Sequence, residues 1–170
     1  QPRLGVQAVR GYLIESGYPT ESITFLDIDM LFPDDEELSQ MLSAKAPDIL
    51  ALSAVLSHSY QQVKRVSQIA RDILPEIWIV VGGHLTASAD VLLRKTKVDI
   101  CIVGDGEVPF NSFVDFVQEG GNRNDLGQLE NTPGVCYLGG DGALVFPGYA
   151  TKPRKEIIAM PDYQFFESGL

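Results

Sequence analysis

Two glycine-rich turns follow two apolar segments in the middle of this sequence. Residues 77–81 are an unbroken apolar run followed by Gly82-Gly83, and residues 100–103 are followed by Gly104-Asp105-Gly106-Glu107. Unbroken apolar runs are typical of strands that are buried on both faces of a parallel sheet. Glycine lets a ligand approach the backbone without meeting a Cβ. The carboxyl ends of parallel strands lie at one edge of the sheet, and ligands of such sheets bind at that edge. The repeated pattern therefore predicts a binding site there.

Small hydroxyl side chains stand near the same predicted edge. Ser53 ends an apolar run at residues 49–53, Ser57 and His58 follow it, and Thr86 and Ser88 follow the first glycine pair. Hydroxyl groups beside a glycine-lined slot would supply hydrogen bonds to a ligand. The alternative is that the serines only terminate the strand and cap the next helix, while His58 lies on the surface. Both interpretations stay open at this stage.

The elements that must position these residues recur with a period of roughly 25 residues, which is typical of strand-helix units. We predict parallel strands at residues 23–28, 49–53, 77–81 and 100–103, with helices at 4–17, from 34, at 60–74 and at 108–118. Residues 134–138 and 143–146 flank Gly139-Gly140-Asp141-Gly142, which predicts a β-hairpin. The fold class is therefore α/β, a flavodoxin-like (Rossmann-like) three-layer open parallel sheet with a C-terminal hairpin extension.

Composition restricts the class of partner and the cellular compartment. The 170 residues have 45% apolar side chains, enough for one domain with a tail. A net charge of −10 without any basic run disfavours binding to nucleic acid or to an anionic membrane. No membrane-spanning or signal pattern is present in the sequence, so we expect a cytoplasmic protein. Cys101 and Cys136 fall inside predicted strands as small buried hydrophobes, not as a disulfide or metal framework.

The order of several segments resembles the cobalamin-binding-like N-terminal domains of cobalamin-dependent radical S-adenosylmethionine enzymes. The segments are LGVQAVRGYLIESGY, PDILALSAVL, IVVGGHLTAS, VDICIVGDGEVPF, PGVCYLGGDGALV and MPDYQFF, and together they span nearly the whole chain. The resemblance implies a cobalamin-binding-like domain at residues 1–121, a loop and hairpin at 122–149, and a linker at 150–170. That linker would lead to a downstream radical S-adenosylmethionine domain, which alone would bind S-adenosylmethionine and an iron-sulfur cluster.

The resemblance also implies which residues contact cobalamin. Ser53-Ala54-Val55 is similar to the family segment beside the nucleotide tail of cobalamin, and Gly82-Gly83 is similar to the glycine pair against that tail. Gly104-Asp105-Gly106-Glu107 resembles a G-E-G-E turn of the family. We expect no catalytic residue and no protein metal ligand in this chain. The expected cofactor-binding residues are Ser53, Val55, Leu56, Ser57, Gly82, Gly83, His84, Thr86, Gly104, Asp105, Gly106 and Glu107.

Three family features are missing from the sequence. There is no D-x-H-x-x-G motif, which implies base-off cobalamin without a histidine ligand from that motif. There is no C-x-x-x-C-x-x-C motif, which implies that this chain alone does not perform radical chemistry. The family strand that precedes the first helix, and lies between residues 23–28 and 49–53 in the sheet, is also missing. We therefore expect a truncated chain whose unpaired strand edges favour homo-oligomers.

Three functions are compatible with these observations. The first is the cobalamin-binding domain of a radical S-adenosylmethionine enzyme, for example a methyltransferase. The second is a cofactor-free scaffold or substrate-recognition module of the same fold. The third is a flavodoxin-like domain that binds flavin or another nucleotide, since fold alone does not determine function.

Overall fold

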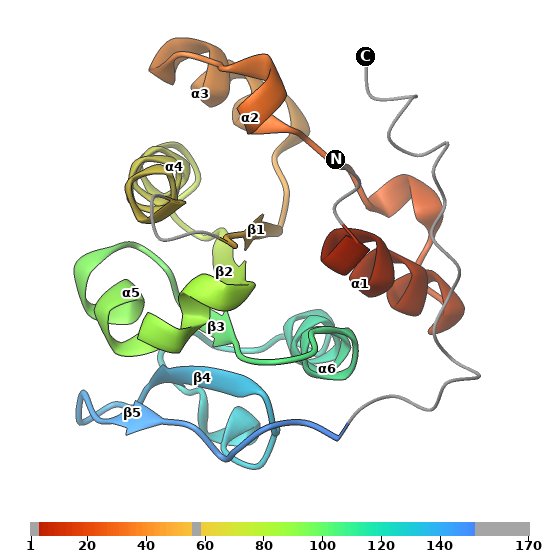
Figure 1. The fold of residues 1–170 in the computed structure, drawn as a ribbon, viewed down its shortest axis with the longest axis vertical. Helices are drawn as coiled ribbons and strands as arrows, with labels where there is room; N and C mark the ends of the chain where they lie inside the picture. Colours follow the sequence, from red (N-terminus) through yellow and green to blue (C-terminus); the bar gives the residue numbers. More distant parts are fainter. Residues whose placement is uncertain (1–3, 56–58, 152–170) are drawn as a thin grey trace.

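The computed structural model describes residues 4–55 and 59–151, which form a three-layer α/β fold (Figure 1). The five-stranded sheet has the order β1-β2-β3-β4-β5. β1, β2 and β3 are parallel, whereas β4 pairs with β3 and β5 with β4 in the antiparallel sense. This confirms the predicted fold class and shows that the hairpin extends the same sheet. The strands are Ile49–Ser53 (β1), Trp78–Gly82 (β2), Ile100–Ile102 (β3), Val135–Leu138 (β4) and Leu144–Val145 (β5).

Helices cover both faces of this sheet. In Figure 1, α4 and α5 lie on one side of the strands and α1 and α6 lie on the other. α3 begins with the capping box expected from the sequence, because Asp34 accepts the backbone N–H of Glu37 while the Glu37 carboxylate accepts that of Asp34. The α-helices are Leu4–Glu15 (α1), Ile28–Leu31 (α2), Asp35–Lys45 (α3), Ser59–Ile73 (α4), Ala89–Lys95 (α5) and Glu107–Gln118 (α6); the 3₁₀ helices are Thr20–Ser22 (η1), His84–Ser88 (η2) and Gly127–Leu129 (η3).

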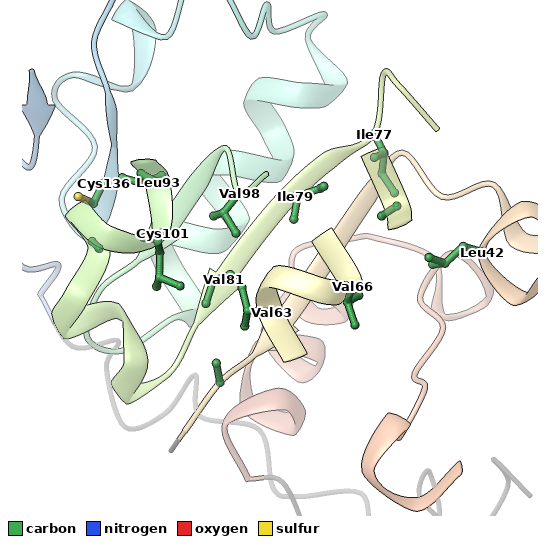
Figure 2. Close-up of a cluster of buried hydrophobic side chains, with 14 of the residues drawn as sticks. Leu42, Val63, Val66, Ile77, Ile79, Val81, Leu93, Val98, Cys101 and Cys136 are labelled. Atoms are coloured by element: carbon green, nitrogen blue, oxygen red, sulfur yellow. The ribbon is translucent and has the colours of Figure 1, made fainter. Parts of the chain in front are cut away.

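The alternation of side chains along β2 divides the core into two clusters. Ile79 and Val81 point toward α4 and α5, in the cluster drawn in Figure 2. Val80 and Trp78 point to the opposite face, where the Trp78 and Phe113 rings meet edge to face with centroids 5.5 Å apart. Each fully buried side chain of this size contributes about 1.5–3 kcal/mol through the hydrophobic effect. β2 is an inner strand, paired with β1 and β3, and its side chains stabilise both clusters.

The predicted strand at residues 23–28 is wrong. Residues 23–27 join no β-ladder of the described chain, and Ile28 begins the short helix α2. The Asp27 carboxylate caps this helix by accepting the backbone N–H groups of Asp29 and Met30, at 3.1 and 3.3 Å. The segment has the apolar residues of a strand, but a strand also needs a hydrogen-bonded neighbour. β1 is an edge strand and does not pair with this segment.

An ion-pair cluster fixes the amino ends of β2 and β3. Asp99, directly before β3, accepts the backbone N–H of Ile79 at 2.8 Å and pairs with Arg71 at 2.7 Å and Arg123 at 3.1 Å. The Arg123 guanidinium also lies 5.0 Å from the centroid of the Trp78 ring. Burial raises the pKa of Asp99, while the Ile79 N–H and the two guanidinium groups oppose that rise. The cluster lies at the edge opposite to the glycine-rich turns and is structural.

Two further expectations concern the cysteines and the membrane. Cys101 and Cys136 are buried free thiols that lie opposite each other on β3 and β4, as expected for small core residues. In the described part of the chain, every helix is too short or too polar to cross a lipid bilayer. The linker predicted at residues 150–170 lies almost wholly outside the described residues.

Candidate functional site

The carboxyl ends of β1, β2 and β3 form one continuous edge. Ser53 pairs with Gly82, and Gly82 pairs with Ile102, so the three strands end in the same row. The turns after these strands are residues 53–55, 82–84 and 104–107, which we call the carboxyl rim. Both glycine-rich turns thus meet at one edge, as the sequence predicts.

The two glycines of the first turn have different roles. A Cβ on Gly83 would lie 2.5 Å from the carbonyl oxygen of Ala54, and Gly83 has a positive φ of 95°. Only glycine lets the turn after β2 pack this closely on the turn after β1. A Cβ on Gly82, in contrast, would meet no atom within 4 Å. Gly83 is therefore required by the fold, whereas the space that a Cβ on Gly82 would occupy is open; we call this space the notch.

The second turn also divides into two parts. Gly104 has a φ of 89°, and a Cβ there would lie 3.3 Å from Cδ1 of Tyr149. A Cβ on Gly106 would lie 3.1 Å from Cγ2 of Val9, so this glycine serves the packing of the turn against α1. Asp105 is exposed, and Glu107 is the first residue of α6, where the helix dipole stabilises a carboxylate. Gly104 and Asp105 are the exposed residues of this turn.

The remaining predicted site residues are distributed unevenly. Ser53 and His84 are exposed on the rim, and Val55 is 52% exposed. Thr86 is buried, and its hydroxyl donates a hydrogen bond of 2.7 Å to the carbonyl oxygen of Gly83, which holds the turn. The structure brings the exposed residues together with Gly82 and places Thr86 beneath them. Leu56, Ser57 and His58 lie outside the described residues.

Sequence reasoning missed one residue of this neighbourhood. Tyr149 follows the hairpin and lies beside Gly104. The sequence before it is Pro147-Gly148, which is an ordinary turn signal and does not indicate a site. Only the path of the chain after β5 brings Tyr149 to the end of β3.

Two pockets lie away from the rim among the described residues. One, of about 230 Å³, is lined by α6 and η3, and the other, of about 390 Å³, lies beside Trp78 and Arg123. The part of the chain that the structure describes contains no group of three His, Cys, Asp or Glu residues suited to a metal ion.

Comparison with family models shows the family of this domain. The model of the B12 binding domain matches residues 1–114, which is about two thirds of the chain. This chain belongs to the B12 binding domain family. The assignment confirms the predicted function as a cobalamin-binding domain and cobalamin as its cofactor. The match ends inside α6, so the hairpin and Tyr149 of this B12 binding domain lie beyond it.

Solved structures show the same fold in larger proteins. The chain is similar to the radical S-adenosylmethionine methyltransferase TsrM from Kitasatospora setae, which was solved with its tryptophan substrate and an S-adenosylmethionine analogue bound. The identity to TsrM is 14% and the TM-score is 0.70. It is also similar to the cobalamin-dependent S-adenosylmethionine radical enzyme OxsB, which was solved with aqua-cobalamin and S-adenosylmethionine bound. The identity to OxsB is 17% and the TM-score is 0.70. The alignments cover 86% and 94% of this chain but only 27% and 21% of those proteins. A search of curated proteins found no match.

Proposed function

We propose that this chain holds cobalamin at the carboxyl rim as the cofactor-binding domain of a radical S-adenosylmethionine enzyme. The observation that supports this location is the open notch at Gly82, between the exposed Ser53 on β1 and the turn at Gly104. A nucleotide tail needs a slot that no side chain fills, and the ends of parallel strands are the usual place for one. Family membership supports cobalamin over flavin as the occupant.

Each residue of the rim would have a distinct task. The Ser53 hydroxyl would hydrogen-bond the tail, Gly82 would let the tail approach the backbone, and Val55 would cover an apolar part of the ligand. Gly83 and Thr86 would keep the turn in place from below. Bound cobalamin supplies organometallic chemistry such as methyl transfer, while the protein orients it.

The lower face of the cofactor would have no histidine from the usual motif. The sequence has two histidines, His58 and His84, and neither stands in a D-x-H-x-x-G context. This supports a base-off form in which the nucleotide tail lies in the slot and is not coordinated to cobalt. Electron paramagnetic resonance of the cobalt(II) form tests this, because a nitrogen ligand from the cofactor base or from a protein imidazole would split the signal and contradict the assignment.

The enzymatic part of the proposal concerns a larger protein. Because this chain covers about a quarter of TsrM and of OxsB, we propose that a further domain binds S-adenosylmethionine and an iron-sulfur cluster. This chain would then present cobalamin to that domain through its open rim. Two buried free thiols are consistent with a reducing, cytoplasmic compartment.

The decisive experiment is retention of the cofactor. Purified protein is mixed with hydroxocobalamin, desalted, and examined for the visible corrin absorbance. A retained band supports the proposal, whereas loss of the band in both the 170-residue chain and a longer form would favour a cofactor-free scaffold or substrate-recognition module. Yellow absorbance that copurifies with the protein would instead favour a flavin.

We also propose self-association through the free edge of β1. The backbone N–H of Ala54 donates to the carbonyl oxygen of Gly82, so Ala54 directs its backbone groups toward β2. Backbone groups of successive residues in a strand point to opposite sides, and those of Ile49, Ala51 and Ser53 therefore point away from β2. Within the described chain no strand pairs with this side. An unpaired edge is a template for another strand. Analytical ultracentrifugation should show dimers that Ala51→Pro weakens, and a strictly monomeric wild-type chain would contradict this proposal.

A further inference from the structure

We infer that Tyr149 forms an aromatic side wall of the cofactor rim at the end of β3. This inference rests on the proposed function, and it assigns a binding role to a residue beyond the segment that the family model matches. The ring contacts the rim directly, since its Cδ1 atom lies 3.3 Å from the position that a Cβ on Gly104 would occupy. A side chain at position 104 would displace the ring, so the positive-φ glycine and the tyrosine fit together.

Two backbone hydrogen bonds hold Tyr149 beside the rim. The N–H of Val103 donates to the carbonyl oxygen of Gly134 at 2.8 Å, and the N–H of Gly134 donates to the carbonyl oxygen of Gly148 at 2.7 Å. Gly134 therefore links the residue before Gly104 to the residue before Tyr149. The start of the hairpin thus fixes the aromatic ring relative to the carboxyl end of β3.

An aromatic neighbour supports the ring from the side. Phe146 and Tyr149 meet edge to face, with ring centroids 5.3 Å apart. Despite these contacts, Tyr149 is 72% exposed and Phe146 is 38% exposed. A tyrosine whose role was only to cover Gly104 would be largely buried. A ring that is held in place yet exposed is suited to contact a ligand through its apolar face.

The chemistry of the ligand follows from this placement. The wall stands at the β3 end of the rim, two strands away from Ser53 on β1, so a ligand that reaches both must be broad. A corrin ring with apolar edges would bury the exposed face of Tyr149, whereas its nucleotide tail would follow the notch at Gly82. The phenol hydroxyl is not required for this contact.

The test compares the affinity of three variants for hydroxocobalamin with that of the wild-type chain. Tyr149→Ala should weaken binding about tenfold, because it removes an aromatic contact from the ligand. Tyr149→Phe should bind like the wild type, because it keeps the ring. Leu144→Ala is the matched control, since it truncates an exposed apolar side chain of the same hairpin that is 42% exposed and has no contact with Gly104.

The outcomes separate this inference from the proposed function. Equal affinity of Tyr149→Ala and wild type would overturn the aromatic wall and leave the cobalamin site standing. Equal losses in Tyr149→Phe and Tyr149→Ala would also overturn it, because the hydroxyl would then be the binding group. Failure of the wild type itself to bind hydroxocobalamin would overturn both. Thermal unfolding of each variant shows whether an affinity loss comes from misfolding, and a Tyr149→Ala variant that binds less tightly only because it unfolds would count against the inference.

Discussion

Alanine substitutions at the adjacent residues Gly82 and Gly83 should impair different properties: Gly83→Ala the stability of the fold, and Gly82→Ala the affinity for the cofactor. In Gly83→Ala the new Cβ would lie 2.5 Å from the carbonyl oxygen of Ala54, at a φ of 95°. With ψ at −177°, this backbone conformation is essentially restricted to glycine and costs a residue with a side chain about 1–3 kcal/mol. The contact forces the backbone apart, so we expect a total loss of roughly 3–5 kcal/mol in the free energy of unfolding. For a chain of this size, such a loss lowers the melting temperature by roughly 10 °C.

Gly82→Ala should preserve the fold and weaken cofactor binding. The added methyl group meets no protein atom within 4 Å, so the free energy of unfolding should change by less than about 1 kcal/mol. The same methyl group would project into the notch proposed for the nucleotide tail. Forcing one extra methyl group against the bound ligand costs about 1–3 kcal/mol, which corresponds to roughly a 5-fold to 150-fold loss of affinity.

Two measurements on the same samples test the different roles of Gly82 and Gly83. Urea unfolding, followed by far-ultraviolet circular dichroism, gives the stability of each variant, and titration with hydroxocobalamin gives its affinity. A Gly82→Ala chain that binds hydroxocobalamin as tightly as the wild type would show that the ligand does not pass over Gly82. A Gly83→Ala chain as stable as the wild type would refute the close approach of the two turns.

Three other predictions concern residues away from the rim. Asp99→Asn should lower the free energy of unfolding by about 3 kcal/mol, because it leaves two partly buried guanidinium groups without their carboxylate. Denaturation by urea measures this loss, and the affinity for hydroxocobalamin should not change if the cluster is only structural. Burial and the 2.5 Å hydrogen bond to Asp115 raise the pKa of Tyr18 to about 12, so the stabilisation by the neutral phenol should be complete below pH 10 and disappear as the pH rises through about 12. Phenolate absorbance of the wild type and of Asp115→Asn measures the shift, and identical titrations of the two would contradict the assignment. Burial raises the pKa of both Cys101 and Cys136, the latter to about 11. Neither thiol should therefore react with a thiol-specific reagent in the native protein at neutral pH, and both should react in denaturant. Rapid reaction of the native protein would show that the core opens.

Local patterns were sufficient for most of the sheet. The apolar run that became β2, the glycine pair after it and the turn at Gly139-Gly140-Asp141-Gly142 each specify a structure within a few residues, and the structure confirms them. The strand predicted at residues 23–28 failed because a β-strand is defined by its partner. The apolar residues there predict a strand, but no neighbouring strand of the described chain pairs with it.

The candidate site shows the same division. Residue types alone indicated that glycines and small polar residues gather at one edge, because parallel strands in one sheet must end together. The sequence could not distinguish Gly82 from Gly83, since the difference is the distance from each to Ala54 across the turn. It also could not place Tyr149, which comes 45 residues after Gly104 and reaches it through hydrogen bonds of Gly134. The sequence alone determined the buried strands and the glycine turns that follow them, because their patterns lie within a few neighbouring residues. The tertiary structure decided whether residues 23–28 find a strand partner, which glycine is open and which aromatic ring stands beside Gly104, because those depend on contacts between distant segments.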